Sequence, residues 1–436
     1  MNSLTIAAIF EMVGKTFAEL PDSRTGKNRS YEMADAAAGA FGIFFTQSPS
    51  FLAYQRDMQR NKGQNNAASL FGVTQIPSDQ QMRNMLDKVA PSNLYEPFWT
   101  IQERMEKAGH LKDHRGHQES YLVAMDGTYY FSSQNIQCDN CTVHQHGDRL
   151  HYYHSAVTPV LVTPDKNRVY PLEPEFILPQ DGAEKQDCER NAAKRWVERC
   201  ASRFEPWQAT ILTDDLHCHQ PFCTLLQENE LNFILVCKPD SHQALYEEID
   251  LLERVDGIES MTTQCWNGRF TEQRRYRFVN QVPLRAGTDA LLVNWCEVTI
   301  HRTDTGERIY YNTFATNFEL TDKSVESVAR SGRARWKVEN ENNNVLKNYG
   351  YNLEHNYGHG EKYLSAVLVT LNLLAFLIHT ILDETNTTYA AIRQELGTRK
   401  TFFNDIRALT RYLYFQDWDT LLNFMATQLE IHREPD

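Results

Sequence analysis

The order of strands and helices expected between residues 121 and 238 constrains the fold of this chain more than any other feature. From Tyr121 the sequence changes from helical periodicity to apolar, β-branched and aromatic runs, which predict strands. The expected elements are two strands joined by a turn in YLVAMDGTYYFSS, a strand at 152–162, a helix at 187–204, a strand at 207–213, a helix at 221–230 and a strand at 231–238. This order predicts an α/β fold with a mixed sheet.

The segments that flank this α/β region differ from it in character. The N-terminal part is predicted to be helical, with an amphipathic helix at 4–20 and a buried helix at 33–45. Residues 257–320 are rich in strand-forming residues and predict a β-rich insertion. We therefore expect five parts: a helical N-terminal region (1–118), the first part of the core (119–240), the insertion (241–321), the second part of the core (322–385) and a helical C-terminal region (386–436).

Two short helices are expected within residues 66–89. Gly72 and Pro77 mark the turn between them, and Ser78 is placed to cap the second helix, 79–89. A helix pair around such a turn is the outline of a helix-turn-helix, in which the second helix would read DNA. The same outline is common in helical hairpins that only pack together, and the sequence leaves both interpretations open.

Composition indicates a globular protein with a sizeable core. The chain has 436 residues, of which 41% are hydrophobic and 23% charged, and its nine Cys fit a reducing compartment. The most apolar segment, 363–382, contains Ser, Thr, Asn and His and predicts a buried helix rather than a membrane span. The first residues lack the pattern of a secretory signal, so we expect a cytoplasmic protein without a membrane partner.

Net charge gives a mixed indication about partners. The formal charge of −13 is unfavourable for binding nucleic acid, which draws on Lys and Arg. Two cationic clusters stand out nevertheless, at residues 269–285 and 330–337. Each cluster is either a phosphate-binding surface or the solvated face of an ordinary element.

A group of Cys and His side chains lies between the second and third expected strands. Cys138, Cys141, His144 and His146 are ligand types that zinc takes in structural sites. The single residue between the two His is unusual for such a site, and the segment also fits the tip of a β-hairpin. We keep a structural zinc ion as one of two interpretations.

Three acids stand at positions where the fold would bring them together. Asp126 ends the first strand, Asp214 ends the strand at 207–213, and Glu339 lies on a helix far along the chain. Neighbouring strand ends meet at one edge of a sheet, where α/β folds place their ligands. Carboxylates gathered there favour Mg²⁺ or Mn²⁺. In isolation, each acid is equally explained by capping or by an ion pair with a neighbour. Asp215 competes with Asp214, which we prefer because it follows the strand directly.

The stretch from residue 329 to residue 360 combines cations, one acid and four Asn. On a regular helix, Arg335 and Glu339 would be about 40° apart, and Glu339 and Lys347 about 80° apart, so one broad face would carry all three. Asn is a mediocre helix former, so its repetition needs another reason, which is contact either with DNA or with adjoining strands.

These residues resemble the DDE transposases of bacterial insertion sequences, in the group whose catalytic core has a β-rich insertion before the last acid. The resemblance covers residues 119–360 and rests on AMDGTYY, ATILTDDL and GRARWKVENENNNVLKNYGYNLEHNYGHG. It implies an RNase H-like mixed-sheet core in which Asp126, Asp214 and Glu339 bind two Mg²⁺ or Mn²⁺ ions. Arg335 matches the Arg of the family's Tyr-Arg-Glu-Lys signature. Lys347 lies eight residues after the Glu where the family has seven, and Gly332 stands at the Tyr position.

The resemblance also implies a function and partners. Family members cut DNA at transposon ends and join the freed 3′-hydroxyl to target DNA, so double-stranded DNA and a homodimeric active complex are expected. A base flipped out of the duplex would be held by Trp266 or Trp295, unless these are core residues. The alternatives are a nuclease that does not join DNA and a non-catalytic DNA-binding protein. The cations expected to contact DNA are Arg335, Lys347, Arg333, Lys337, Arg274, Arg275 and Arg277.

Overall fold

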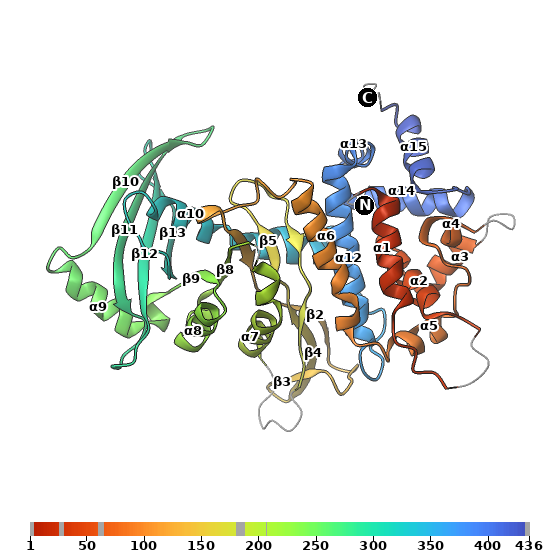
Figure 1. Cartoon of the computed structure of the whole chain (residues 1–436), viewed down its shortest axis with the longest axis horizontal. Coiled ribbons are helices and arrows are strands. Elements are labelled where there is room, and N and C mark those ends of the chain that lie inside the picture. Colours follow the sequence, from red (N-terminus) through yellow and green to blue (C-terminus); the bar gives the residue numbers. More distant parts are fainter. Residues whose placement is uncertain (1–3, 26–29, 60–64, 180–187, 206, 432–436) are drawn as a thin grey trace.

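The computed structural model describes residues 4–25, 30–59, 65–179, 188–205 and 207–431. The elements form three zones along the long axis of the molecule (Figure 1). Helices from both ends of the chain lie together at one end, the central sheet lies in the middle, and a group of long strands occupies the other end. Segments from the two ends of the sequence therefore build one helical zone.

The helical zone contains the predicted N-terminal and C-terminal helices. The helices expected at 4–20 and 33–45 are present as α1 and α2. The zone consists of α1 (Ile6–Ala18), α2 (Met33–Phe45), α3 (Phe51–Gln59), α4 (Asn66–Phe71), α5 (Asp79–Leu86), α6 (Glu96–Lys107), α13 (Thr387–Leu396), α14 (Arg399–Tyr412) and α15 (Trp418–Gln428).

The pair α4 and α5 is built into this helical zone. Ser78 caps α5 as predicted, accepting a hydrogen bond of 3.3 Å from the backbone N–H of Gln81. The Asn66 side chain at the start of α4 donates to the carbonyls of Thr410 and Leu413 near the end of α14. Asp87, which follows α5, accepts backbone N–H bonds from residues 361–364. These contacts are what a packing hairpin requires, and DNA reading by α5 stays a prediction.

The predicted mixed sheet is present and has nine strands, in the order β10-β11-β12-β13-β9-β8-β1-β5-β6. Only β1, β8 and β9 run parallel to one another, and the other neighbours are antiparallel. The strands are β1 (Tyr121–Ala124), β5 (Val160–Val162), β6 (Tyr170–Pro171), β8 (Ala209–Thr213), β9 (Asn232–Val236), β10 (Glu259–Trp266), β11 (Thr271–Pro283), β12 (Leu292–Arg302) and β13 (Arg308–Thr316).

The β-rich insertion extends the central sheet. Its last strand, β13, pairs antiparallel with β9, so that Phe314 lies opposite Val236. Every residue of β8 is buried, whereas exposed and half-buried residues alternate along β10, which has no buried residue. The contrast arises because helices pack on the central strands, while one face of the insertion is open to solvent.

The single strand predicted at 152–162 is wrong, because the chain changes sheets there. β4 (Arg149–Val157) belongs to a second, four-stranded sheet with β2 (Gly127–Ser133), β3 (Thr142–His146) and β7 (Glu175–Ile177), while β5 belongs to the large one. Thr158 and Pro159 separate the two strands. The Thr158 backbone N–H donates to the carbonyl of Asp126 at 3.0 Å, and Pro159 has no N–H to continue a ladder.

Four further helices complete the core: α7 (Glu189–Cys200), α8 (Gln220–Glu228), α9 (Gln243–Glu253) and α12 (Leu364–Thr385). The buried helix predicted at 363–382 is α12. It is long and apolar enough to cross a membrane, but 89% of its most apolar window is buried inside the protein. It packs against α2, α6 and β6, which identifies it as a core helix that joins the helical zone to the sheet.

The long helix expected around Glu339 is interrupted. α10 (Val325–Arg333) ends early, a π-helical turn follows at Val338–Asn343, and α11 (Asn344–Asn348) is short. A π-turn changes the angular offset of every later residue, so the single face expected for Arg335, Glu339 and Lys347 does not apply.

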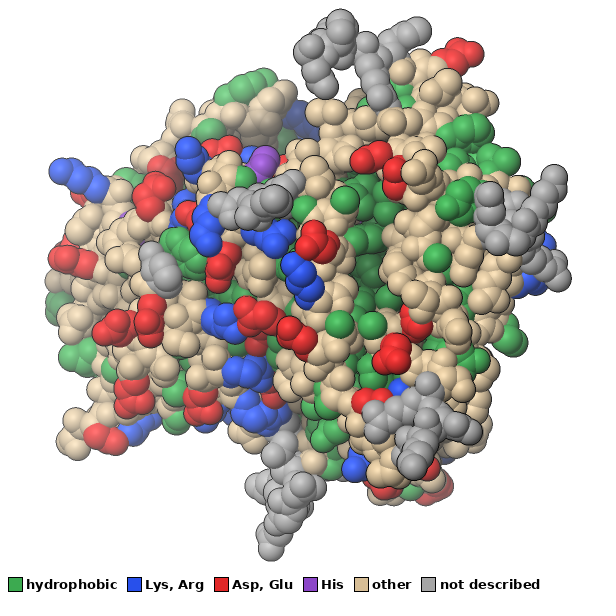
Figure 2. Space-filling view, turned by 45° about the vertical axis from the view of Figure 1, so that its right-hand side comes forward, with side chains coloured by type: hydrophobic (Ala, Val, Ile, Leu, Met, Phe, Trp, Pro, Cys, Tyr) green, Lys and Arg blue, Asp and Glu red, His purple; other side chains and the backbone are tan. Residues whose placement is uncertain are grey.

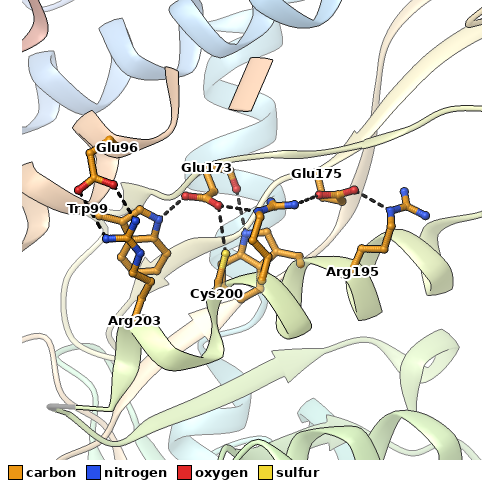
Figure 3. Close-up of polar contacts among 9 residues, drawn as sticks. Glu96, Trp99, Glu173, Glu175, Arg195, Cys200 and Arg203 are labelled. Carbon is orange, nitrogen blue, oxygen red and sulfur yellow. Dashed lines mark hydrogen bonds and ion pairs between the residues drawn. The ribbon is translucent and has the colours of Figure 1, made fainter. Parts of the chain in front are cut away.

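A buried polar network fixes α7 (Figure 3). Glu173 is 3% exposed and accepts hydrogen bonds from Trp99 Nε1 of α6, from Arg199 Nε at 2.9 Å and from Cys200 Sγ at 3.1 Å. Glu175 pairs with Arg199 and with Arg195, the latter at 2.8 Å. The network connects α6, the β6–β7 segment and α7, and thereby sets the position of the first residue of α7.

Candidate active site

Asp126 and Asp214 lie at the same edge of the sheet, next to each other in strand order. β1 and β8 are parallel, with Ala124 opposite Leu212, and the Met125 N–H donates to the Leu212 carbonyl at 3.0 Å. Each acid comes within two residues of its strand's end, so both carboxylates emerge at the carboxyl edge. This is where open α/β sheets place ligands.

The electrostatics of Asp126 shows how closely acids gather there. The pKa of this carboxyl is raised to about 7, chiefly by burial and then by the charges of Glu189, Glu339 and Asp214, against an opposing effect of Arg335. Burial also raises the pKa of Asp214. The charge of Glu189 adds to this rise, and that of His217 opposes it. We call Asp126, Glu189, Asp214 and Glu339 the acid cluster.

Glu189 is the member of the cluster that sequence analysis missed. It begins α7, and its carboxylate accepts the Gly127 backbone N–H at 3.0 Å and contacts His217 Nε2 at 3.1 Å. A Cβ added at Gly127 would lie 2.2 Å from this carboxylate. The space beside Gly127 is therefore filled by Glu189. No motif or strand end marks Glu189, because its place depends on how α7 packs.

Glu339 reaches the site from the π-helical turn. Its carboxylate is about half exposed and pairs with Arg335 at 2.6 Å. The Arg335 Nη1 is buried and has no hydrogen-bond partner among the described residues. A guanidinium nitrogen left without a partner indicates a group that the protein itself does not supply. π-turns occur frequently at functional sites.

The Asn run is partly explained by contacts with an adjoining strand end. Asn343 is buried and donates to Asp126 Oδ2 at 3.4 Å, while its own oxygen accepts from Thr158 Oγ1 at 2.8 Å and from Asn342 at 3.0 Å. Asn344 accepts from Asn348 at 2.7 Å. Asn343 therefore orients Asp126, so the contact with adjoining strands accounts for this member of the run.

Asp214 and Asp215 have different partners. Asp214 accepts the Leu216 N–H at 3.0 Å and so caps the short turn that follows β8. Asp215 accepts the Lys238 N–H at 2.6 Å and contacts His242 Nε2 at 3.3 Å, beyond the end of β9. Asp214, but not Asp215, is among the charges that raise the pKa of Asp126.

Most of the cations expected to bind DNA have partners within the protein. Lys337 is 2% exposed, and its amine donates to the carbonyls of Pro164 and Lys166, so DNA contact by this side chain stays a prediction that these contacts do not support. Lys347 pairs with Glu354 at 3.0 Å. Arg274 pairs with Glu272 and Glu326, and Arg277 pairs with Glu253 and Glu297. Arg275 and Arg333 are exposed.

The position of Gly332 explains why no Tyr stands there. A Cβ at this position would lie 2.7 Å from Ile234 Cγ2 and 2.9 Å from Phe314 Cε1. α10 thus packs its glycine directly on β9 and β13, where any larger side chain would force the helix away. The departure from the signature is a consequence of close packing.

The two Trp considered for holding a flipped base differ in exposure. Trp295 is 1% exposed and its ring nitrogen donates to the Tyr246 hydroxyl at 3.3 Å, so it belongs to the core. Trp266 is 63% exposed at the end of β10.

The four residues expected to bind zinc do not come together as a set. His144 is exposed and packs its ring against Tyr153, and the side chain of His146 lies outside the described part of the structure. Cys138 and Cys141 are close to each other, with His154 and His359 beside them. Of the four residues considered for zinc, only Cys138 and Cys141 are therefore brought together, and zinc binding by them stays a prediction.

Removing the charge of Asp126 should stabilise the metal-free protein. The carboxyl titrates near 3.8 when unfolded and at about 7 when folded, so its ionisation destabilises the fold increasingly between these values. We expect Asp126→Asn, measured with chelator, to melt at a higher temperature than the parent at pH 8. The gain should shrink as pH falls from about 7 to about 4. Asp322→Asn, at an exposed site, should show no such gain, and a lower melting temperature for Asp126→Asn at pH 8 would contradict the clustering.

Comparisons with known proteins find a distant likeness among solved structures. No protein-family model matches the chain. No curated protein matches it either. Among solved structures, the cryo-EM structure of a piggyBac transposase synaptic complex with hairpin DNA is similar over 98% of this chain and 82% of that chain, with 11% sequence identity and a TM-score of 0.41.

Proposed function

We propose that the chain is a DDE transposase of a bacterial insertion sequence, which cuts transposon ends and transfers the freed 3′-hydroxyl to target DNA as a homodimer. The observation that carries this proposal is the acid cluster, in which Asp126 and Asp214 follow adjacent parallel strands and Glu339 approaches from a π-turn. In this proposal β1, β5, β6, β8 and β9 are an RNase H-like core, to which the insertion adds its strands.

The donor set suits hard divalent cations. Burial, and after it the charges of three neighbouring carboxylates, raise the pKa of Asp126, so a cation placed there would relieve the repulsion. Asp126, Asp214 and Glu339 would hold two Mg²⁺ or Mn²⁺ ions, with Glu189 beside them. Bound ions of this kind activate a water or a 3′-hydroxyl and stabilise the leaving oxygen.

The chain's own residues prepare this edge for DNA. Asn343 fixes the carboxylate of Asp126, and Arg335 fixes that of Glu339. The Nη1 of Arg335 is buried and has no hydrogen-bond partner among the described residues, so it would donate to a phosphate oxygen of the scissile strand only after the side chain turns outward on DNA binding.

A second surface supports DNA binding. Arg274, Arg330, Arg333 and Trp336 line a pocket between α10 and the insertion. Arg333 stacks over the Tyr310 ring at 4.4 Å. Elsewhere, Lys and Arg side chains lie interspersed with Asp and Glu on the face shown in Figure 2, as the net charge of −13 leads one to expect. A local basic and aromatic surface is therefore the better candidate for the phosphate backbone.

The test is an assay with DNA that flanks the coding region, incubated with the full chain and Mg²⁺ or Mn²⁺. Cleaved ends and joined products in the presence of target DNA support the proposal. Cleaved DNA without joined product would favour a nuclease on the same site. Absence of both, together with absence of Mn²⁺ binding in calorimetry, would favour a non-catalytic DNA-binding protein.

Arg333→Ala should weaken DNA binding in a salt-dependent way. Loss of one phosphate contact is expected to reduce the slope of log affinity against log salt by about 1. Fluorescence anisotropy on one duplex at several salt concentrations measures this slope. Arg285→Ala is the matched control, because Arg285 is exposed and pairs with Asp289 at a turn of the insertion. If both variants gave the same slope of log affinity against log salt, Arg333 would not be a DNA contact.

A further inference from the structure

We propose that Cys138, Cys141, His154 and His359 bind one structural zinc ion. Their ligand atoms all lie within 4.8 Å of one another. Cys138 and Cys141 are in the turn before β3, His154 is in β4, and His359 is in the segment that follows Glu339 and α11. We call these residues the Cys–His cluster. It is a different site from the acid cluster, with different ligand chemistry.

The distances are those of a tetrahedron around zinc. With Zn–S of about 2.3 Å and Zn–N of about 2.05 Å, tetrahedral geometry puts S···S at about 3.8 Å, S···N at about 3.6 Å and N···N at about 3.4 Å. The Sγ atoms of Cys138 and Cys141 are 3.7 Å apart. His154 Nε2 lies 3.2 Å and 3.4 Å from these sulfurs and 3.1 Å from His359 Nδ1. These four edges agree with the expected values to within about 0.4 Å.

Local structure explains why these four converge. β3 and β4 pair with Thr142 opposite Tyr153, so the same register extended by one residue puts Cys141 opposite His154. The turn before β3 brings Cys138 back, with the Cys141 N–H donating to the Cys138 carbonyl at 3.1 Å. The Cys138 N–H points at Cys141 Sγ at 3.4 Å, a contact that stabilises a thiolate ligand.

The imidazole rings are held by aromatic neighbours. Tyr130 stacks on His154 at a centroid distance of 5.6 Å, and Phe131 meets the His359 ring edge-to-face at 4.0 Å. His154 is 2% exposed and Cys141 is 4% exposed. Four protein ligands around a largely closed site leave no open position for a substrate, which is the pattern of structural rather than catalytic zinc.

The expected effect is to tie the chain after Glu339 to the strand after Asp126. β2 begins directly after Asp126, and β4 pairs with it, while His359 lies within the loop that joins α11 to α12. Asn140 adds to this connection by donating to the Lys362 carbonyl. Zinc would therefore hold together the two chain segments that carry the first and last acids.

The test measures metal bound to the full chain purified from zinc-supplemented cells. Elemental analysis should find about one zinc per chain in the parent, and near zero in Cys138→Ser and in His359→Gln. His144→Gln is the matched control, because His144 lies on the same hairpin outside the cluster, and it should keep its zinc. Absence of zinc from the parent, or zinc retained in both cluster variants, would overturn the proposal.

Two further controls separate this site from others. Asp126→Asn combined with Glu339→Gln should keep zinc even where DNA cleavage is lost, so zinc binding and the proposed function fail independently. Cys237→Ser removes one of three other gathered groups, Cys218, Cys237 and His242, and should also keep zinc. If Cys237→Ser lost its zinc while His359→Gln kept it, the ion would belong to the group of Cys218, Cys237 and His242, and the proposal would be overturned.

Cobalt substitution tests the ligand set without any variant. Co²⁺ bound by two thiolates and two imidazoles in a tetrahedron gives strong visible absorption together with thiolate-to-metal charge transfer. We expect both bands in the parent and their loss on adding excess zinc. A weak, octahedral spectrum would contradict the four-ligand site even if Cys138→Ser failed to fold.

Discussion

Asp126→Ala is expected to abolish DNA cleavage and strand transfer, with a loss of at least about 10³-fold in either rate. Burial and neighbouring acids raise the pKa of Asp126 to about 7. Asn343 donates a hydrogen bond to one of its carboxylate oxygens. In the proposed function Asp126 is a metal ligand, so its removal takes away a donor that the two-metal reaction requires. The measurement is product formation on labelled end DNA with Mg²⁺ or Mn²⁺.

Asp214→Ala and Glu339→Ala should show losses of similar size in the same assay. Asp215→Asn is the control, because it is adjacent in sequence but contacts Lys238 and His242 instead of the cluster. It should keep most of the activity. Wild-type rates in Asp126→Ala, or a full loss in Asp215→Asn with normal melting behaviour, would rule out the assignment.

Glu173→Ala is expected to lower the free energy of unfolding by about 2–4 kcal/mol. The substitution leaves Trp99 Nε1 and Arg199 Nε without their acceptor at a site where Glu173 is 3% exposed (Figure 3). Arg199 keeps its pair with Glu175 and is partly exposed, which limits the loss. Chemical denaturation measures the change.

Glu96→Ala tests the same network at its surface. Glu96 pairs with Arg203 at 2.6 Å, and its side chain is 58% exposed, so its removal should cost less than about 1 kcal/mol. Equal effects of Glu96→Ala and Glu173→Ala would show that burial does not set the strength of these contacts. Because α7 begins with Glu189, we also expect Glu173→Ala to reduce activity beyond its effect on stability.

Sequence periodicity was sufficient to predict most helices and strands. It was insufficient where the chain passes from one sheet to another or where a helix is interrupted. The helices predicted at 33–45 and 363–382 are present as α2 and α12. They were predictable because their apolar residues are the ones that the fold buries. The strand predicted at 152–162 is divided, because a strand that leaves one sheet for another keeps the same apolar composition. The helix around Glu339 is broken by a π-turn, for which propensity offers no signal.

Some residues of the candidate site could likewise be predicted from the sequence, and others could not. Asp126 and Asp214 were found because each follows a strand, and parallel pairing of β1 and β8 brings strand ends together. Glu189 was missed because its place depends on α7, which Glu173 and Glu175 anchor from the far end. Lys337 was assigned to DNA from its charge alone, while its amine is buried against two carbonyls.

By itself, the sequence determined the α/β order, the strand ends that carry two acids, and the pair of cysteines, because these depend on local periodicity and spacing. Tertiary structure alone decided that Glu189 joins the acids and that His154 and His359, rather than His144, approach Cys138 and Cys141. The reason is range: His359 is more than 200 residues from the two Cys, and only the packing of the loop before α12 against β2 and β4 brings it to them.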